Sequence, residues 1–190
     1  MPADFDGDGK TDAAVFRPST GTWFILQSGG GGTNIVPFGS SGDKPVAFDY
    51  DGDGKADIGI VRDNATSGNK EWWIQRSSLG ILILNFGIPG DKTVPGDYTG
   101  DGKADVAFFR PSSGFWYILR SEDFSFFSFG WGQAGDIPAP GDYDGDGKTD
   151  AVVFRPSSST WFVNRTGGQG PLITGFGAAT DTPVPSSLVR

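Results

Sequence analysis

Short apolar stretches alternate with polar turns along the whole chain. In the first 48 residues the apolar stretches are "AAVFR" at 13–17, "TWFILQ" at 22–27, "TNIVPFG" at 33–39 and "PVAF" at 45–48. They are rich in β-branched and aromatic residues and are separated by Gly, Pro, Ser and Asp, which is typical of strands joined by tight turns. No window shows the helical apolar period of about 3.6 residues. The pattern therefore predicts an all-β chain.

One polar turn is an acidic nonapeptide that recurs along the chain. Its four copies are "DFDGDGKTD" at 4–12, "DYDGDGKAD" at 49–57, "DYTGDGKAD" at 97–105 and "DYDGDGKTD" at 142–150. Successive copies start 45, 48 and 45 residues apart. Four-stranded units of about 40–50 residues are typical of β-propeller blades. We therefore predict a β-propeller of four four-stranded blades in a single domain, with repeats at 4–48, 49–96, 97–141 and 142–190.

Other residues recur in step with the acidic turn. An arginine follows the first strand after each turn, at Arg17, Arg62, Arg110 and Arg155. An aspartate stands in each later loop, at Asp43, Asp91, Asp136 and Asp181. We favour ion pairs between the two sets that lock blade to blade, and the alternative is an anion site lined by the arginines. We assign Trp23, Trp73, Trp116 and Trp161 to the second full strand as packing between blades, with Trp72 as an addition to the pattern.

Composition restricts the chemistry of the acidic turns. The chain has no cysteine and no histidine, so any bound metal must have oxygen ligands, which points to a hard cation. The turns contain 15 of the 23 acidic residues, and four divalent ions would balance the net charge of −8. Nothing resembles a basic face for nucleic acid. There is no membrane span, since an apolar run of about 18 residues is missing.

The spacing within each turn matches an oxygen-ligand cage. In 49–57, the side chains of Asp49, Asp51, Asp53 and Asp57 and the Lys55 carbonyl can converge on one ion. Gly54 permits the sharp turn, as at the sixth position of an EF-hand loop. Ile60 stands where an EF-hand has Glu, and strands flank the turn, so the resemblance to an EF-hand is partial. The corresponding residues elsewhere are Asp4, Asp6, Asp8, Lys10 and Asp12; Asp97, Thr99, Asp101, Lys103 and Asp105; and Asp142, Asp144, Asp146, Lys148 and Asp150.

We predict calcium in these turns, about four ions in all. A flexible, carboxylate-rich cage suits Ca²⁺ better than the smaller Mg²⁺. Thr99 replaces an aspartate, so the third site lacks one negative charge and is expected to be the weakest. Extracellular calcium modules bind at roughly 10⁻⁴–10⁻³ M, which favours a secreted or cell-surface location. We expect the ions to pin turns, and the alternative is an ion that bridges to a ligand.

The repeat as a whole resembles a known family. The acidic turn, the "FG" of Phe38–Gly39, Phe86–Gly87 and Phe176–Gly177, and the downstream "GD…P" are similar to FG-GAP or VCBS repeats. The resemblance covers essentially the whole chain. It implies the calcium-loaded propeller of integrin α-chains and of many bacterial secreted proteins. It implies no single function, because adhesion proteins, lectins and some polysaccharide lyases use this repeat.

Two features indicate possible contact surfaces. The strand "DFSFFSFGWG" at 123–132 has aromatic residues on both faces, which fits either a partner or sugar contact or wider packing between blades. "NKEWWIQ" at 69–75 is a weaker candidate. The C-terminal segment 181–190 aligns with the lead-in at 43–50, so we expect it to supply or pair with the first strand of blade 1. Within one chain this closes a four-bladed ring, and between chains it gives a larger ring or a filament.

Three functions stay open from the sequence. The first is a non-catalytic extracellular binding or adhesion module, the second is a lectin with aromatic pockets between blades, and the third is a self-assembling surface or filament subunit. An enzyme is not expected, because the aspartates are mostly committed to metal and the glutamates, Glu71 and Glu122, form no visible pair. Residues 1–10 lack the basic and apolar parts of a signal peptide, so we expect a removed leader or a larger parent protein.

Overall fold

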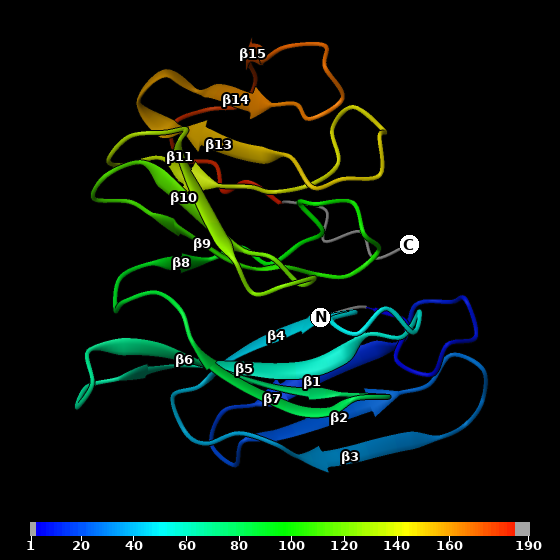
Figure 1. Cartoon of the computed structure of the whole chain (residues 1–190). Coiled ribbons are helices and arrows are strands. Elements are labelled where there is room, and N and C mark those ends of the chain that lie inside the picture. Colours follow the sequence, from blue (N-terminus) through cyan, green and yellow to red (C-terminus); the bar gives the residue numbers. More distant parts are fainter. Residues whose placement is uncertain (1–2, 185–190) are drawn as a thin grey trace. The chain divides into compact units, whose positions relative to one another are not determined.

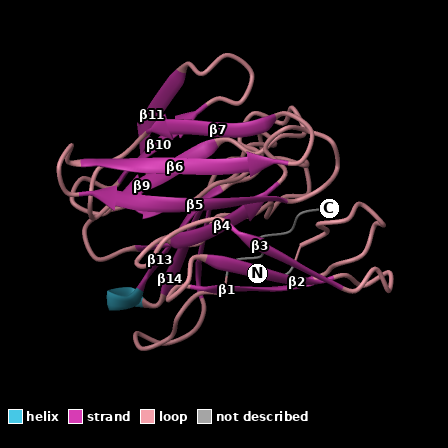
Figure 2. Ribbon diagram, turned by 90° about the horizontal axis from the view of Figure 1, so that it is seen from below, coloured by secondary structure: helices cyan, strands magenta, loops and turns pink. Residues whose placement is uncertain are grey.

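Strands make up nearly all the regular structure of the chain. The computed structural model describes residues 3–184, and Figure 2 shows strands joined by loops. In that range the one helical element is a short 3-10 turn, η1 (Pro156–Ser158). The described residues form two compact units, 3–89 and 90–184. The predicted all-β class is confirmed.

Unit 1 contains two antiparallel sheets, drawn in blue to green in Figure 1. Blade 1 has the strand order β1 (Ala13–Arg17), β2 (Thr22–Leu26) and β3 (Thr33–Pro37). Blade 2 has the order β4 (Lys44–Phe48), β5 (Asp57–Asn64), β6 (Asn69–Arg76) and β7 (Gly80–Asn85). The four strands predicted in the first 48 residues are therefore confirmed to within two residues at each end.

Unit 2 contains two four-stranded antiparallel sheets. Blade 3 has the order β8 (Lys92–Thr93), β9 (Val106–Arg110), β10 (Phe115–Leu119) and β11 (Phe126–Gly130). Blade 4 has the order β12 (Ile137–Pro138), β13 (Ala151–Arg155), β14 (Thr160–Asn164) and β15 (Leu172–Gly175). In each four-stranded blade the acidic turn joins the first strand to the second, as predicted.

Blade 1 differs from the prediction of four strands in every blade. Within residues 3–184 its sheet has three strands, and the place of a first strand is marked only by the bridge between Ala3 and Asp12. Equivalent bridges, Gly96–Asp105 and Gly141–Asp150, follow the first strands of blades 3 and 4. The prediction that the tail at 181–190 completes blade 1 depends on residues 185–190, which lie outside the described range.

Alternation along the strands gives each blade one face that carries its buried or half-buried repeat tryptophan, Trp23, Trp72, Trp116 or Trp161; it is here called the Trp face. In blade 1 the cross-strand row on this face is Phe16, Trp23 and Val36, with the Phe16 and Trp23 ring centroids 5.5 Å apart. Blade 3 repeats the arrangement with Phe109 and Trp116 at 5.4 Å. The rings in these rows are tilted against one another. Each row gives its sheet a large apolar surface that must pack against another sheet.

The structure corrects the tryptophan assignment in blade 2. Trp72 pairs with Val61 as Trp23 pairs with Phe16, and Trp72 is fully buried. Its indole Nε1 donates to the Phe86 carbonyl at 2.8 Å, as Trp116 donates to the Trp131 carbonyl. Trp73 lies on the opposite face and is half-buried. Trp72, and not Trp73, is therefore the repeat tryptophan.

Two glycines permit the tight turn before the Trp strand. Gly21 and Gly114 have φ of +61° and +73°, a region that favours glycine. A Cβ at either position would lie 2.2 Å from a carbonyl oxygen, that of Gly39 or Gly132. The chain therefore passes too close to its own backbone at these turns for any side chain. In blade 2 the longer β5–β6 hairpin places Lys70 at the equivalent position, with its ammonium paired to Asp63.

Three of the four repeat arginines form bidentate ion pairs. Arg62 pairs with Asp43, Arg110 with Asp91 and Arg155 with Asp136, with N–O distances of 2.7–2.9 Å. The aspartate side chains are almost fully buried, so each pair is partly shielded from water. The structural prediction is confirmed for these arginines, but the pairs lie within one blade and not between blades. Each ion pair joins the loop before the first strand of its blade to the end of the second strand.

Candidate metal centre

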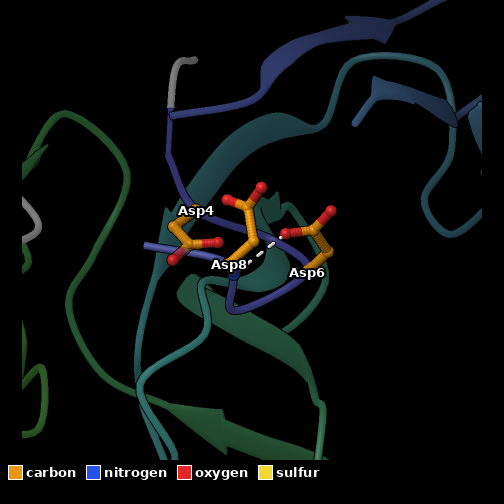
Figure 3. A group of neighbouring side chains, drawn as sticks. All are labelled: Asp4, Asp6 and Asp8. Atoms are coloured by element: carbon orange, nitrogen blue, oxygen red, sulfur yellow. Dashed lines mark hydrogen bonds between the residues drawn. The ribbon is translucent and has the colours of Figure 1, made fainter. Parts of the chain in front are cut away.

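Three acidic turns bring three carboxylates together. The groups are Asp4, Asp6 and Asp8; Asp49, Asp51 and Asp53; and Asp142, Asp144 and Asp146. In each group one carboxylate oxygen per residue lies within 4.8 Å of the others. Figure 3 shows the first group at a single turn, with the hydrogen bond from the Asp8 amide to Asp6. Three negative charges this close repel one another unless a cation lies among them.

The first aspartate of each turn fixes the loop backbone. The Asp49 carboxylate accepts the amides of Gly52 at 2.6 Å and Gly54 at 2.8 Å. Asp4, Asp97 and Asp142 make the same two bonds to the glycines of their own turns. Gly52 and Gly54 have φ of +80° and +85°, so the repeated "DGDG" spacing supplies glycine where the turn needs it. The local sequence thus folds the acidic residues around one centre.

The third position carries an unsatisfied oxygen atom in the second and third turns. Asp51 is 8 % exposed, and its Oδ1 is buried without a hydrogen-bond partner, while its Oδ2 accepts from Ser78 and Leu79. In the third turn the Thr99 hydroxyl oxygen is also buried without a partner. A buried polar atom without a partner costs about 1–3 kcal/mol. Both atoms lie where a cation ligand was predicted, so the chain's own residues fit a bound cation.

The ninth position has a role that sequence reasoning missed. The four aspartates there are Asp12, Asp57, Asp105 and Asp150, and each is buried. Asp57 accepts the Tyr50 amide with one oxygen and the Ser77 amide with the other, and its three equivalents repeat this pair of bonds. Each carboxylate therefore ties the acidic turn to the loop after the next hairpin, and it stands outside the three carboxylate groups.

Burial perturbs the ninth-position carboxylates. It raises the pKa of Asp57 and of Asp105 to about 6, although backbone hydrogen bonds act to lower it. It also raises the pKa of Asp150. For Asp12 burial acts in the same direction, but hydrogen bonds from Ser28 and Phe5 outweigh it, and the pKa lies below the ordinary value. A nearby cation would favour the ionised form of all four groups.

The fifth position also connects the turn to the next hairpin. Asp53 accepts a hydrogen bond from the Ser77 hydroxyl at 2.6 Å and from the Lys55 amide at 2.9 Å. Asp101 and Asp146 make the equivalent bonds to Ser121 and Thr166. The signal for this partner is present in the sequence as a Ser or Thr that follows every Trp strand. The Lys10, Lys55, Lys103 and Lys148 carbonyls remain predicted ligands.

Neighbouring acidic turns are joined within each unit. The Ala56 amide donates to the Asp4 carbonyl at 2.6 Å, and the Thr149 amide donates to the Asp97 carbonyl at 2.6 Å. The Lys55 side chain crosses the first turn so closely that a Cβ on Gly7 would lie 2.9 Å from its Cε. Each pair of turns therefore forms one continuous acidic edge of its unit.

An aromatic surface lies on the face of blade 3 opposite its Trp face. Tyr117 stacks on Phe108 at 4.7 Å, with the Arg110 guanidinium 4.8 Å from the Tyr117 centroid. Phe115 is 41 % exposed and Phe126 is 63 % exposed. Of the predicted 123–132 aromatic edge, Phe127, Phe129 and Trp131 pack against the core of unit 2. The packing interpretation is therefore confirmed for one face of the strand, and a partner or sugar contact on the other face stays a prediction.

Comparison with known proteins identifies the family. The FG-GAP-like repeat matches residues 4–60 and 97–153, more than half of the chain, so the chain belongs to this family. No curated protein matches. A solved lectin from Agrocybe aegerita, described for its recognition of non-reducing terminal N-acetylglucosamine, has a similar fold, with a TM-score of 0.60 and 21% identity. The match covers 93% of this chain and 49% of the lectin chain, so the chain spans about half the lectin's length.

The fold and the repeat together define a protein built from β-propeller-like blades. The described residues contain no helix with the length and apolar character needed to cross a bilayer.

Proposed function

We propose that the chain is a non-catalytic binding module whose blades are held by calcium and which works outside the cell. The observation that carries this proposal is the buried Asp51 Oδ1 without a partner, beside two further carboxylates of the same turn. The same turn recurs in equivalent places, which suits a structural ion better than a single catalytic one. The side chains imply oxygen coordination, and a calcium-rich medium of roughly 10⁻³ M would fill such sites.

Calcium titration tests the metal part of this proposal. Isothermal titration calorimetry with CaCl₂ on chelator-treated protein should show binding at several sites, and the melting temperature should rise with calcium by mass action. Mg²⁺ at the same concentration should give a smaller rise. The Asp51→Ala variant should lose one site, whereas Asp63→Ala, an aspartate paired with Lys70 outside the turns, should lose none. Absence of heat and of any thermal shift would overturn the proposal.

The chain's residues favour a non-catalytic role. Without histidine or cysteine, a general base would have to come from the carboxylates, Lys or Tyr. Glu71 is already engaged, since its carboxylate accepts from Asn64 and Trp73. The turn aspartates are held by backbone amides, which fixes them in place.

Carbohydrate is the ligand class that we propose for the module. Sugars bind to proteins through apolar ring contacts, and Phe115 and Phe126 offer exposed aromatic rings on one face of blade 3. Gly130 faces Phe115 across the β10–β11 pair, and the Phe115 ring lies so close that a Cβ on Gly130 would stand 3.3 Å from it. The similarity of fold to a lectin supports this choice over adhesion to a protein.

A glycan array in the presence of calcium tests the ligand class. We expect binding that falls at least several-fold in Phe115→Ala and Phe126→Ala and that is kept in Ile81→Ala, which truncates an exposed apolar residue on β7. Binding that the two phenylalanine variants leave unchanged would move the ligand surface elsewhere. Failure of the whole array, with calcium binding intact, would refute the carbohydrate proposal alone.

A further inference from the structure

Within each unit, the Trp face of one blade covers the opposite face of the next blade. In unit 1, Trp23 and Ile25 of blade 1 form one cluster with Ala47 and Ile58 of blade 2. In unit 2, Phe109 and Trp116 of blade 3 form a cluster with Ala151 and Val153 of blade 4. The Trp131 indole also donates to the Phe162 carbonyl at 3.1 Å. The structure therefore shows which surface complements a Trp face.

The opposite face of blade 1 is exposed. Val15 stands two residues before the repeat arginine of blade 1. In each of the other blades the residue at this position is buried. Val15 is 63% exposed, while the equivalents Ile60, Phe108 and Val153 are 1%, 3% and 0% exposed. Ile35 on the same face is 58% exposed. Blade 1 thus presents an apolar surface of the kind that a Trp face covers.

The Trp face of blade 4 is exposed along the β15 side only. Leu172 on β15 is 40% exposed, whereas Phe154 and Val163 on the same face are buried. Trp161 is half-buried, whereas Trp23, Trp72 and Trp116 are all 0% exposed. The aromatic residue that follows the last strand, Phe176, is 74% exposed. The exposed face of blade 1 and the exposed β15 edge of blade 4 are therefore of the same two kinds as the surfaces that meet inside each unit.

Arg17 and Asp181 occupy the positions of a fourth ion pair in the repeat, but they are not paired with each other in the structure. In each of the three pairs the arginine follows its aspartate by 19 residues. Among residues 3–184, Arg17 has no carboxylate partner, and its guanidinium lies 4.3 Å from the Phe24 centroid. Asp181 accepts the Ala178 amide at 2.9 Å, as Asp136 accepts the Gln133 amide at 3.0 Å. Asp181 is thus held in the same turn, without an arginine among the described residues.

We propose that a second copy of this chain places the Trp face of its blade 4 on the opposite face of blade 1. Asp181 of one copy then pairs with Arg17 of the other in the bidentate geometry of the three internal pairs. The contact joins different surfaces, so it is head-to-tail, and it gives a closed ring if the rotation closes and a filament if it does not. Burial of the exposed apolar residues supplies the attraction, and the ion pair fixes the register.

Analytical ultracentrifugation in calcium over a wide concentration range tests this proposal. The wild-type mass should rise above the chain mass of 20.1 kDa with concentration. Arg17→Asp and Asp181→Arg should each weaken association by about tenfold or more, because each places like charges together. An equimolar mixture of the two variants should associate again, since every contact in the mixture can join opposite charges. Recovery on mixing requires the contact to lie between chains.

Two control variants match these charge changes elsewhere. Arg120→Asp changes an arginine that also lies over an aromatic ring, 4.6 Å from Phe127. Asp123→Arg changes an exposed aspartate that also accepts a turn amide, that of Ser125. Both controls should associate like the wild type, and circular dichroism should show every variant folded. A wild type that stays at the chain mass, single variants that associate normally, or a mixture that does not recover would each overturn the proposal.

Discussion

At the scale of single residues, the aspartates of an acidic turn have different structural roles. The aspartate at the first position folds the glycine backbone, and the one at the ninth position ties the turn to the next hairpin. At the third position, Asp51 of the second turn has a buried oxygen without a protein partner. The sequence predicted all of them as metal ligands. The aspartate at the ninth position has a different role because its buried carboxylate lies beside two backbone amides that need acceptors, and it accepts hydrogen bonds from both.

Restoring the missing carboxylate should strengthen the third site. We expect Thr99→Asp to tighten calcium binding at this turn by about tenfold, because ligand charge tunes affinity in oxygen cages. In chelator the same variant should melt at a lower temperature than the wild type, since it adds a repelling charge. Calorimetry and thermal melts measure the two effects. Thr11→Asp adds the same charge at an exposed turn position outside the predicted ligands and should leave the affinity unchanged.

Removal of a ninth-position carboxylate should cost stability with or without calcium. Asp105→Ala leaves the buried amides of Tyr98 and Ser121 without acceptors, so we expect a loss of about 2–5 kcal/mol in urea unfolding. Asp101→Ala, at an exposed position of the same turn, should matter mainly when calcium is present. If the Asp105 variant were destabilised only in calcium, the tie between turn and hairpin would not be its main role.

At the scale of elements, strand pairing decides which side chains enter the core. The β5–β6 hairpin is longer than the equivalent hairpins, so the distance from Arg62 to Trp72 is 10 residues where the other blades have 6. The difference is even, and an even shift keeps a strand residue on the same face. That parity, visible in the sequence, would have identified Trp72 as the core residue and Trp73 as the addition.

The two adjacent tryptophans should respond very differently to truncation. Trp72→Ala removes a fully buried side chain and should destabilise the protein by about 3–5 kcal/mol. Trp73→Ala removes a half-buried side chain on the opposite face and should cost about 1 kcal/mol or less. Urea unfolding of the two variants, with each verified as folded beforehand, measures the contrast. Equal losses would contradict the register of blade 2.

At the scale of the whole molecule, charge sets the conditions for stability. The net charge is −8, and 15 of the 23 acidic residues lie in the four turns. Neighbouring turns are joined edge to edge within each unit, so their charges repel over short distances as well as within each turn. Cations bound in the turns would cancel much of this repulsion.

Salt should therefore substitute in part for calcium. In chelator, the melting temperature should rise as NaCl is raised from low to about 0.5 M, because screening shortens the Debye length to a few ångströms. With calcium bound, the same salt series should change the melting temperature little. Differential scanning fluorimetry with both series on one plate makes the comparison. A flat response in chelator would mean that repulsion among the turns is not a major destabilising force.

The sequence by itself determined the strands, the tight turns and the acidic centres. Strands, turns and acidic centres depend on residues within about ten positions of one another. The glycines that the φ angles of the turn require are an example. Local sequence patterns therefore indicate these features directly. Tertiary structure decided which tryptophan is buried, that the Arg62–Asp43 pair lies within one blade, and that Asp57 joins two loops. Those outcomes depend on the register of strand pairing and on contacts between segments distant in the sequence. The burial of whole sheet faces decides which register and which contacts form. The same burial left Val15 and Phe176 exposed at the two terminal blades, where a second copy can cover them.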